Sequence, residues 1–438
     1  MTEREGFTAQ LTRRGALARM GGAVAAGALA QFPTPLVARA ETRSLKIGLL
    51  ASISGLRSDF GAVDTWIVER VQKTVANGID IEGTNYPVEI IVKDNQSDPN
   101  QTAVAARDLI LREKCDLILT DDGDNSSGAA AELADARGVP MISTLSPWEA
   151  WVFGRHGAPD KGFPFTFHYC IGAGDVFKLY TDMWNSLKTN KKVGTIYMDS
   201  AAARGFADPA HGLPVLLQKN GYTEVNTGFF QLSNDDFTNQ IASLVGGEVG
   251  ILSGSCYPNH FATFWNQAAQ NGFQPEAVTV AGPFLFPSAL EGLGDLGDGM
   301  STEVLWNPAL PYTSSMTGQT ARQLADEYEQ NTGTQWTQPL GISHSLWEVG
   351  FAALKGAADP KDNKSIRDSI ASLKVDTVVG PLDFAGSPVK NVAIQKLVGG
   401  QWRKTKDGKF PFELVVVHAG TSGVTPTAEL VPLSQIRS

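Results

Sequence analysis

The chain has 438 residues and 42% hydrophobic composition, so it can bury more than one core, because a single core stops growing near about 250–300 residues. Its formal net charge is −10. Without residues 1–40, which hold five Arg and two Glu, 31 basic and 44 acidic residues remain, a net charge of −13. Such a surface repels polyanions, and no Lys/Arg run interrupts it, so no nucleic acid and no anionic lipid is expected as a partner.

Residues 1–40 show the succession of regions that an export signal has. Paired arginines at 13–14 precede a mildly apolar, Gly/Ala-rich run at 20–32, and small residues at 38 and 40 stand where a signal peptidase cleaves. The segment resembles a twin-arginine signal, with Gly15 where a large apolar residue is commoner. It is too weakly apolar for a stable membrane span. We therefore expect a signal peptide over 1–40 and a mature chain in the periplasm without stable membrane insertion; a disordered basic tail is the alternative.

The three cysteines, Cys115, Cys170 and Cys256, lie far apart in the sequence. Their odd number and their spacing fit neither a disulfide scaffold nor a CxxC metal site. Three buried thiols are expected, with one disulfide as the alternative. The sequence also has no G-x-S-x-G elbow and no HExxH pairing. The chain is therefore not expected to be an enzyme, and no metal or other cofactor is predicted.

From residue 44 onward, short apolar runs alternate with helix-length amphipathic ones. The first set predicts strands at 45–53, 88–93, 117–120 and 139–144. A helix is predicted from Ser58 or Asp59 to about Gly78, another after Asp98-Pro99, and a third after the acidic segment that follows residue 120. This βαβαβαβ order is typical of a parallel sheet with helices on both faces.

A second set of the same kind follows residue 165. It predicts strands at 193–198, 228–231, 249–253 and 278–281, with helices at 175–187, 209–220, 236–245 and 259–271. Helices near 317–331, 340–358 and 365–373 and strands near 389–397 close the chain. The predicted fold class is therefore α/β, with two Rossmann-like lobes.

Two segments resemble ligand motifs in a context that does not suit them. The segment GLGDLGDG at 292–299 contains GxGxxG, but it follows a predicted helix, and Asp295 and Asp298 would repel phosphate. We predict a turn there. The segment 94–100 alternates oxygen acceptors as a calcium loop does, but it lacks the Gly and the distant Glu of such a loop. Asp98 before Pro99 is instead predicted to cap the next helix.

Polar side chains follow the strand predicted at 117–120. They are Asp121, Asp122, Asp124, Asn125, Ser126 and Ser127. In open parallel sheets, ligands bind outside the carboxyl ends of strands, where helix N-termini favour anions. Three further predicted strand ends, at 143–148, 199–204 and 253–257, carry similar polar groups, with aromatic residues interspersed. Simple helix capping explains any one of these residues as well, but together they predict a pocket that orients one small molecule.

The chain resembles the type I periplasmic solute-binding proteins, specifically the leucine/isoleucine/valine-binding group of ABC importers. The matching stretches are KIGLLASISGLRSDFG (46–61), KDNQSDPNQTAVAARDLI (93–110), GVPMIST (138–144), SGSCYPNHF (253–261) and VVGPLDF (378–384). The resemblance covers nearly all of residues 44 to about 418. It implies two lobes with parallel sheets flanked by helices, joined by three interlobe crossovers, that close on a ligand like a hinge.

The resemblance also implies where the lobes divide. The crossovers fall near 165–169, 302–308 and 382–386. Lobe 1 is then expected over 44–167 plus 306–381 and lobe 2 over 168–305 plus 382–420, followed by a C-terminal tail over 421–438. Each lobe is therefore discontinuous in the sequence.

Ligand-binding roles carry over from the resemblance by position. The hydroxyl contact of the first lobe falls at Ser126 or Ser127, and a second first-lobe loop, at 145–147, takes the ligand carboxylate. Aromatic contacts of the second lobe fall near Arg204 and at Cys256-Tyr257. The predicted ligand-binding residues are Asp122, Asn125, Ser126, Ser127, Leu145, Ser146, Pro147, Trp148, Arg204, Cys256, Tyr257 and Phe284.

One position departs from the pattern of the family. Amino-acid binders of the family have an acidic residue after a Gly-Pro pair, which pairs with the ligand ammonium, and this chain has Phe284 there. An unpaired buried charge is costly. Either Asp121, Asp122 or Asp124 replaces that acid, or the ligand has no α-amino group. We favour the second interpretation, because nearby aromatic residues suit an apolar or aromatic body and Arg204 suits a carboxylate.

The resemblance implies an extracytoplasmic solute-binding component of an ABC importer. Its expected ligand is a small organic acid, aromatic acids included, or an amino-acid-like solute, which it delivers to a permease of the inner membrane. Binding of a branched-chain amino acid proper is the first alternative. An exported, cofactor-dependent enzyme is the alternative from another class.

Overall fold

The computed structural model describes residues 44–437, without the side chains of residues 124–126. The predicted signal peptide lies outside the described residues. The described residues all belong to one compact unit. Within the described part of the chain, no helix combines the length and the apolar character that a membrane span requires.

The first large sheet has six strands, all parallel. In spatial order they are β15 (Val392–Ile394), β7 (Thr166–Cys170), β6 (Met141–Ser143), β5 (Leu117–Thr120), β1 (Leu45–Ala51) and β4 (Val88–Asp94). The helices that belong with this sheet are α1 (Ser58–Gly61), α2 (Asp64–Thr74), α3 (Pro99–Arg107), the π-helical turn η1 (Asp108–Glu113), α4 (Asp124–Arg137), α5 (Trp148–Gly154), α12 (Ala321–Thr332), α13 (Gln338–Lys355) and α14 (Asn363–Ser372). The continuous apolar run of β5 is fully buried, as expected for a central parallel strand.

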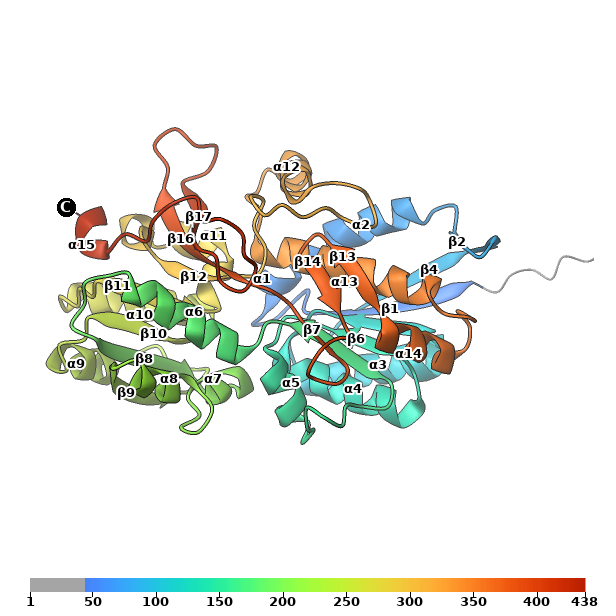
Figure 1. Cartoon of the computed structure of the whole chain (residues 1–438), viewed down its shortest axis with the longest axis horizontal. Helices are drawn as coiled ribbons and strands as arrows, with labels where there is room; N and C mark the ends of the chain where they lie inside the picture. The colour runs from blue at the N-terminus through green and yellow to red at the C-terminus, as the bar shows by residue number, and fades with distance from the viewer. Residues whose placement is uncertain (1–43, 438) are drawn as a thin grey trace, which may run out of the picture. The chain divides into compact units, whose positions relative to one another are not determined.

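The second large sheet has seven strands (Figure 1). In spatial order they are β17 (Phe412–His418), β16 (Val398–Lys404), β12 (Ser301–Val304), β11 (Ala277–Ala281), β10 (Ile251–Ser255), β8 (Lys192–Met198) and β9 (Thr223–Phe230). Its helices are α6 (Ala173–Asn185), α7 (Ala201–Phe206), α8 (Leu213–Lys219), α9 (Thr238–Gly246), α10 (Pro258–Gln270), η2 (Pro283–Leu285), α11 (Pro287–Glu291), η3 (Gly294–Gly297) and α15 (Leu433–Ile436). The pairs β12–β16 and β16–β17 are antiparallel. The two sheets with their flanking helices confirm the predicted fold class.

Two short antiparallel pairs lie outside these sheets. They are β2 (Ile79–Ile81) with β3 (Thr84–Tyr86), and β13 (Lys374–Thr377) with β14 (Gly380–Asp383). Neither pair is predicted from the sequence, because these strands have no continuous apolar run and too few positions to show a clear alternation.

The chain passes between the two sheets three times. It leaves the first sheet after β7 and returns after β12 to α12 and α13, of which α13 packs against α2 and β5. It leaves the first sheet again after β15. The last passage lies between residues 394 and 398, later than the 382–386 predicted, because β15 adds a parallel strand beside β7. Val392 is fully buried there and packs with Trp151 and Val389. Residues 392–394, which were predicted in lobe 2, therefore belong to the first sheet.

The helix predicted from residue 58 is divided into α1 and α2. Gly61 brings the end of α1 against the backbone that follows β1, since a Cβ at this position would lie 2.3 Å from the Ser52 carbonyl oxygen. The helix then restarts at Asp64. This close approach holds the loop at 52–57 at the carboxyl end of β1.

Other local predictions are confirmed. Asp98 caps α3 by accepting from the backbone N–H groups of Asn100 and Gln101, with Pro99 in the first turn. The segment 292–299 follows the short helix α11 and forms the single turn η3. Cys115, Cys170 and Cys256 are free and buried. Burial raises the pKa of the Cys115 and Cys170 thiols to about 12.

Candidate functional site

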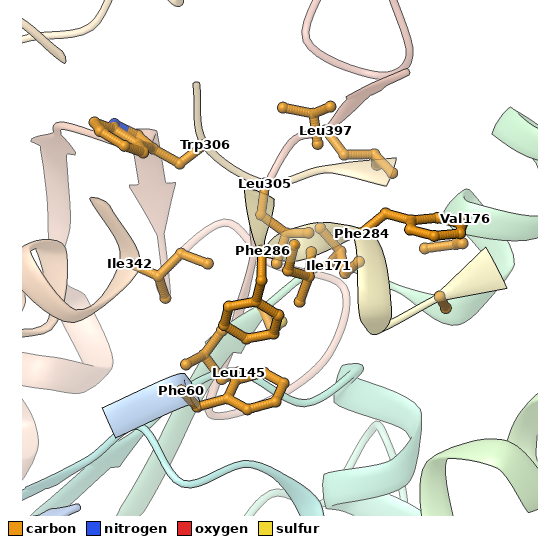
Figure 2. Close-up of a cluster of buried hydrophobic side chains, with 14 of the residues drawn as sticks. Phe60, Leu145, Ile171, Val176, Phe284, Phe286, Leu305, Trp306, Ile342 and Leu397 are labelled. Atoms are coloured by element: carbon orange, nitrogen blue, oxygen red, sulfur yellow. The ribbon is translucent and has the colours of Figure 1, made fainter. Parts of the chain in front are cut away.

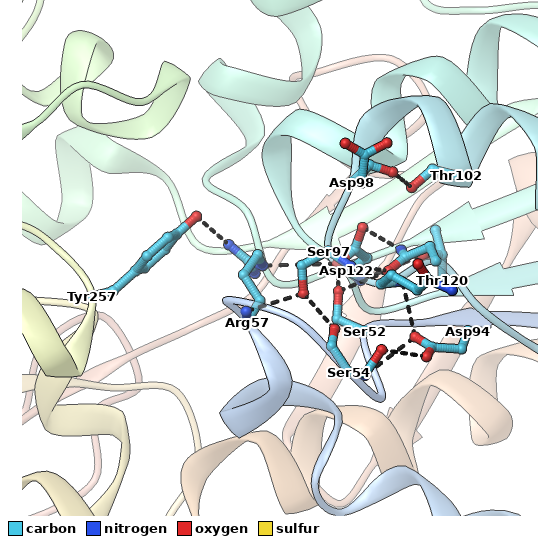
Figure 3. Close-up of polar contacts among 12 residues, drawn as sticks. Ser52, Ser54, Arg57, Asp94, Ser97, Asp98, Thr102, Thr120, Asp122 and Tyr257 are labelled. Carbon is cyan, nitrogen blue, oxygen red and sulfur yellow. Dashed lines mark hydrogen bonds and ion pairs between the residues drawn. The ribbon is translucent and has the colours of Figure 1, made fainter. Parts of the chain in front are cut away.

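Arg57 lies in the loop between β1 and α1, at the carboxyl end of the first sheet. Its Nε is 3.8 Å from Oδ1 of Asp122, and its guanidinium carbon is 4.2 Å from the centre of the Phe60 ring. Nη1 lies 3.4 Å from the hydroxyl oxygen of Tyr257, which follows β10 of the second sheet. Figure 3 shows Arg57 between Asp122 and Tyr257. The arginine therefore connects the carboxyl ends of the two sheets.

Asp122 forms the polar support behind Arg57. The Ser52 hydroxyl donates to Oδ1 of Asp122, and Asn95 Nδ2 donates to Oδ2 at 2.6 Å. Only 1% of Asp122 is exposed. The carboxyl ends of β1, β4 and β5 thus supply one buried network that fixes the position of the guanidinium (Figure 3).

A second buried carboxyl group lies beside this network. Asp121 accepts from the Ser343 hydroxyl of α13, and Asp64 at the start of α2 faces Asp121. Burial raises the pKa of both carboxyls, and the charge of Asp121 raises that of Asp64 further. Each of the two carboxyls is therefore harder to ionise than an exposed aspartate.

The loop after β6 forms the next part of the site. Leu145 has φ 62°, a left-handed conformation, and His168 holds the carbonyl oxygen of Ser146 at 2.8 Å from its Nε2. A carbonyl only accepts, so Nε2 carries the proton, and Nδ1 accepts from the Ser143 hydroxyl at 2.8 Å. Burial lowers the pKa of His168 to about 4, which keeps the ring neutral. His168 thereby fixes the backbone of residues 145–147.

A cavity of about 100 Å³ lies where these loops meet the carboxyl ends of the second sheet. Residues from both sheets line it: Arg57, Phe60, Leu145, Ser146, Pro147, Cys170, Ile171, Met198, Ser200, Ala202, Phe206, Ser255, Cys256, Tyr257, Ala281, Gly282, Leu285, Glu303 and Leu305. Most of these side chains are apolar. Figure 2 shows how Phe60, Leu145, Ile171 and Leu305 gather in this region. The lining suits a small ligand with an apolar body and few polar groups.

Helix N-termini contribute to the wall of the cavity. The N-cap residues Pro147 of α5, Ser200 of α7 and Tyr257 of α10 all line it. The partial positive charge at the start of the 13-residue helix α10 favours negative charge nearby. Among the described lining residues, Arg57 is the one Lys or Arg, and Glu303 is the one carboxyl group.

Five of the predicted ligand-binding residues line the cavity, namely Leu145, Ser146, Pro147, Cys256 and Tyr257. Asp122 lies behind Arg57. Ser127 is fully buried near the start of α4 and does not line the cavity. Asn125 and Ser126 lie among the side chains that the structure does not describe.

Three other predicted residues do not line the cavity. Arg204 forms an ion pair with Asp199 at 2.7 Å, and 59% of its side chain is exposed. Trp148 packs beside Phe153, with ring centres 5.9 Å apart. Phe284 is fully buried and packs edge-on against Phe261. Figure 2 shows it in one apolar cluster with Ile171 and Leu305.

The sequence analysis does not single out Arg57, Phe60 or Glu303. Arg57 and Phe60 lie within the stretch 46–61 that carries the resemblance, and Arg57 is the one charged side chain between the predicted strand at 45–53 and the predicted start of the helix at 58. Glu303 lies on β12, which the analysis does not predict as a strand. No local pattern marks its side chain as a cavity residue. No cluster of three or more His, Cys, Asp or Glu side chains in the described part of the chain could hold a metal ion.

Comparisons with known proteins agree with this fold. Residues 44–409 match the family described as periplasmic binding protein. A leucine-binding protein from Thermotoga maritima superposes with a TM-score of 0.67 at 20% identity, over 85% of this chain and 98% of that one. A solute-binding protein of an ABC transporter from Rhodopseudomonas palustris, solved with 3,4-dihydroxybenzoic acid, superposes with a TM-score of 0.69 at 19% identity. The match covers 89% of this chain and 98% of that one. Another solute-binding protein from R. palustris, solved with benzoate, superposes with a TM-score of 0.66 at 17% identity. The match covers 89% of this chain and 99% of that one.

Proposed function

Because the chain belongs to the periplasmic binding protein family, we propose that it is the extracytoplasmic solute-binding component of an ABC importer. It binds a small organic acid reversibly in the cavity between the two sheets and delivers it to a permease of the inner membrane. A twin-arginine signal at 1–40 exports it to the periplasm. The lobes expected over 44–167 plus 306–381 and over 168–305 plus 382–420 close on the ligand, with residues 392–394 moving with lobe 1.

The observation that carries the choice of an acid is the position of Arg57. Its guanidinium lines a mostly apolar cavity and is held in place by Asp122, Phe60 and Tyr257. A planar guanidinium matches a carboxylate in geometry as well as in charge. The partial positive charge at the N-terminus of α10 also favours a negatively charged ligand group. Arg57 therefore takes the role for which the sequence analysis proposed Arg204.

The apolar lining supports a ligand with a compact hydrophobic body. Phe60, Ile171, Phe206, Leu285 and Leu305 line the space beside Arg57. Aromatic side chains pack favourably on a flat aromatic ligand in edge-to-face or offset arrangements. The R. palustris proteins solved with benzoate and with 3,4-dihydroxybenzoic acid share this fold. Benzoate-type acids are therefore the first ligands to test.

Isothermal titration calorimetry tests the proposal on protein that has been unfolded, dialysed and refolded to remove any retained solute. The titrants are benzoate, the three monohydroxybenzoates, 3,4-dihydroxybenzoate, leucine and valine. We expect at least one acid of the benzoate type to bind more tightly than either amino acid. Tight binding of leucine with no response to any of the acids would overturn the preference for organic acids.

The proposal is for binding without chemical conversion. Mass spectrometry of the solute before and after prolonged incubation with the protein should return the same compound in the same amount. The solute retained by freshly purified protein, identified in the same way, gives an independent assignment. Turnover of that solute would favour the exported enzyme instead.

A further inference from the structure

Glu303 is the charged group on the second-sheet side of the cavity. It lies on β12, between β11 and β16, and lines the cavity, although only 4% of the residue is exposed. Arg57 lines the same cavity from the loop after β1. The cavity thus has one cationic and one carboxyl side chain, each from a different sheet.

The carboxyl group of Glu303 is held by hydrogen-bond donors. The Tyr180 hydroxyl donates to its Oε2, and the Thr302 hydroxyl donates to the same atom at 2.9 Å. A carboxylate has about four acceptor sites. Both side-chain donors use Oε2, and among the described residues no side chain donates to Oε1; the backbone N–H groups of Gly282 and Glu303 also lie near the carboxyl group. The group is therefore oriented as an acceptor.

No Lys, Arg or His side chain between residues 44 and 437 forms an ion pair with Glu303. Burial raises its pKa, while hydrogen bonds from Tyr180, from the backbone N–H of Glu303 itself, from Thr302 and from the backbone N–H of Gly282 lower it. A buried carboxylate without a cation is costly, and any further donor that approaches it reduces that cost. Since Glu303 lines the cavity, a bound ligand can supply such a donor.

We propose that Glu303 accepts a hydrogen bond from the ligand, so that the preferred acids carry a donor group, either a hydroxyl or an ammonium, in addition to the carboxylate bound by Arg57. The inference rests on the proposed function and names the class of ligand within it. Glu303 then substitutes, from a different strand, for the acid that Phe284 does not provide. A hydroxy acid and an amino acid satisfy the same acceptor, and the experiment distinguishes them.

The experiment compares acids that differ only in the donor. One set is benzoate against its three monohydroxy derivatives, and the other is 4-methylpentanoate against leucine, which adds an α-ammonium. Calorimetry on the full-length mature protein should show that in at least one set a donor-bearing acid binds about tenfold or more tightly than the bare acid. In Glu303→Met, that ratio should fall to within about threefold.

Glu303→Gln distinguishes a hydroxyl donor from an ammonium donor of the ligand. It also tests the role of Glu303 if the Met variant does not fold. Its neutral amide oxygen still accepts from a hydroxyl but no longer compensates an ammonium charge. A hydroxyl preference should therefore shrink only severalfold, whereas an ammonium preference should disappear. Glu348→Gln is the matched control. Glu348 is also buried and accepts from the backbone N–H of Val378 at 2.9 Å, but it does not line the cavity, so its variant should keep the wild-type ratio.

The outcomes separate this inference from the proposed function. If acids bind but none gains affinity from a donor, or if both Glu303 variants keep the wild-type ratio, the role of Glu303 is overturned and the proposed function stands. If no acid in either set binds to the wild-type protein, both are overturned.

Discussion

Arg57 and Tyr257, 200 residues apart in the sequence, meet at the cavity, where Nη1 of the arginine lies 3.4 Å from the tyrosine hydroxyl oxygen. The arginine comes from the loop after β1 of the first sheet, and the tyrosine caps α10 after β10 of the second sheet. The guanidinium is also 3.8 Å from Asp122 and lies over the Phe60 ring. It is therefore fixed in position before a ligand arrives, which reduces the entropy lost on binding.

Replacing Arg57 by Met should weaken the binding of organic acids by about tenfold to a hundredfold. The substitution removes the cationic side chain of the cavity, and hydrogen bonds between charged partners contribute about 1.5–3 kcal/mol. Titration calorimetry with the tightest acid measures the loss. Arg204→Met is the matched control, because Arg204 pairs with Asp199 outside the cavity and should leave the affinity unchanged. A large loss in the Arg204 variant with none in the Arg57 variant would reverse the assignment.

Tyr257→Phe should speed ligand release by a few-fold with little change in the association rate. The hydroxyl accepts from Arg57 across the cavity, and an intramolecular hydrogen bond of ordinary strength contributes about 0.5–1.5 kcal/mol. Since the contact joins the two sheets, its loss should favour opening. Stopped-flow fluorescence gives both rates. An unchanged dissociation rate would show that this contact does not stabilise the closed form.

Asp64→Asn should stabilise the protein more as the pH rises. The folded-state pKa of Asp64 is raised above its ordinary value, so between those two pH values the folded chain binds more protons than the unfolded chain. The free energy of unfolding therefore falls as pH increases, by at most about 1.4 kcal/mol per pH unit for one proton. Among the described residues Asp64 Oδ2 has no hydrogen-bond partner, and an amide could donate to Asp121 instead. Urea denaturation from pH 5 to 8 should show a flatter profile for the variant; parallel profiles would contradict the prediction.

Because His168 is buried and neutral, it should make the folded protein less stable at acidic pH. Its folded-state pKa is lowered from 6.5 to about 4, so the unfolded chain binds more protons between these values and stability is lost as the pH falls. The loss should approach about 3 kcal/mol by pH 4 for this group. Burial lowers the pKa of His344 to about 3, so protonation of His344 also reduces stability as the pH falls. The glutamine of His168→Gln can still donate to the Ser146 carbonyl. In acid, the free energy of unfolding of this variant should depend less steeply on pH than that of the wild type, by the equivalent of up to one bound proton. A slope equal to that of the wild type would exclude His168 as its source.

Much of the fold could be predicted from the sequence, because the evidence for it is local. The apolar run at 117–120 is β5, with the bounds predicted, and the amphipathic spacing at 259–271 is α10 to within one residue. Asp98 and Pro99 indicated the start of α3 for the same reason. β2 and β12 have too few positions to define a period and lack the continuous apolar run that marks β5, and they were missed.

The sequence by itself determined the family, the two α/β lobes and the loops that surround the site, since periodicity and the matching stretches act within one segment. Only the tertiary structure decided which side chains of those loops face the cavity. Arg57 lines it and Arg204 does not, although both follow strands; Phe284 packs into a core, and Glu303 on a neighbouring strand occupies the wall. These outcomes depend on packing between residues up to 200 positions apart, which no local pattern records.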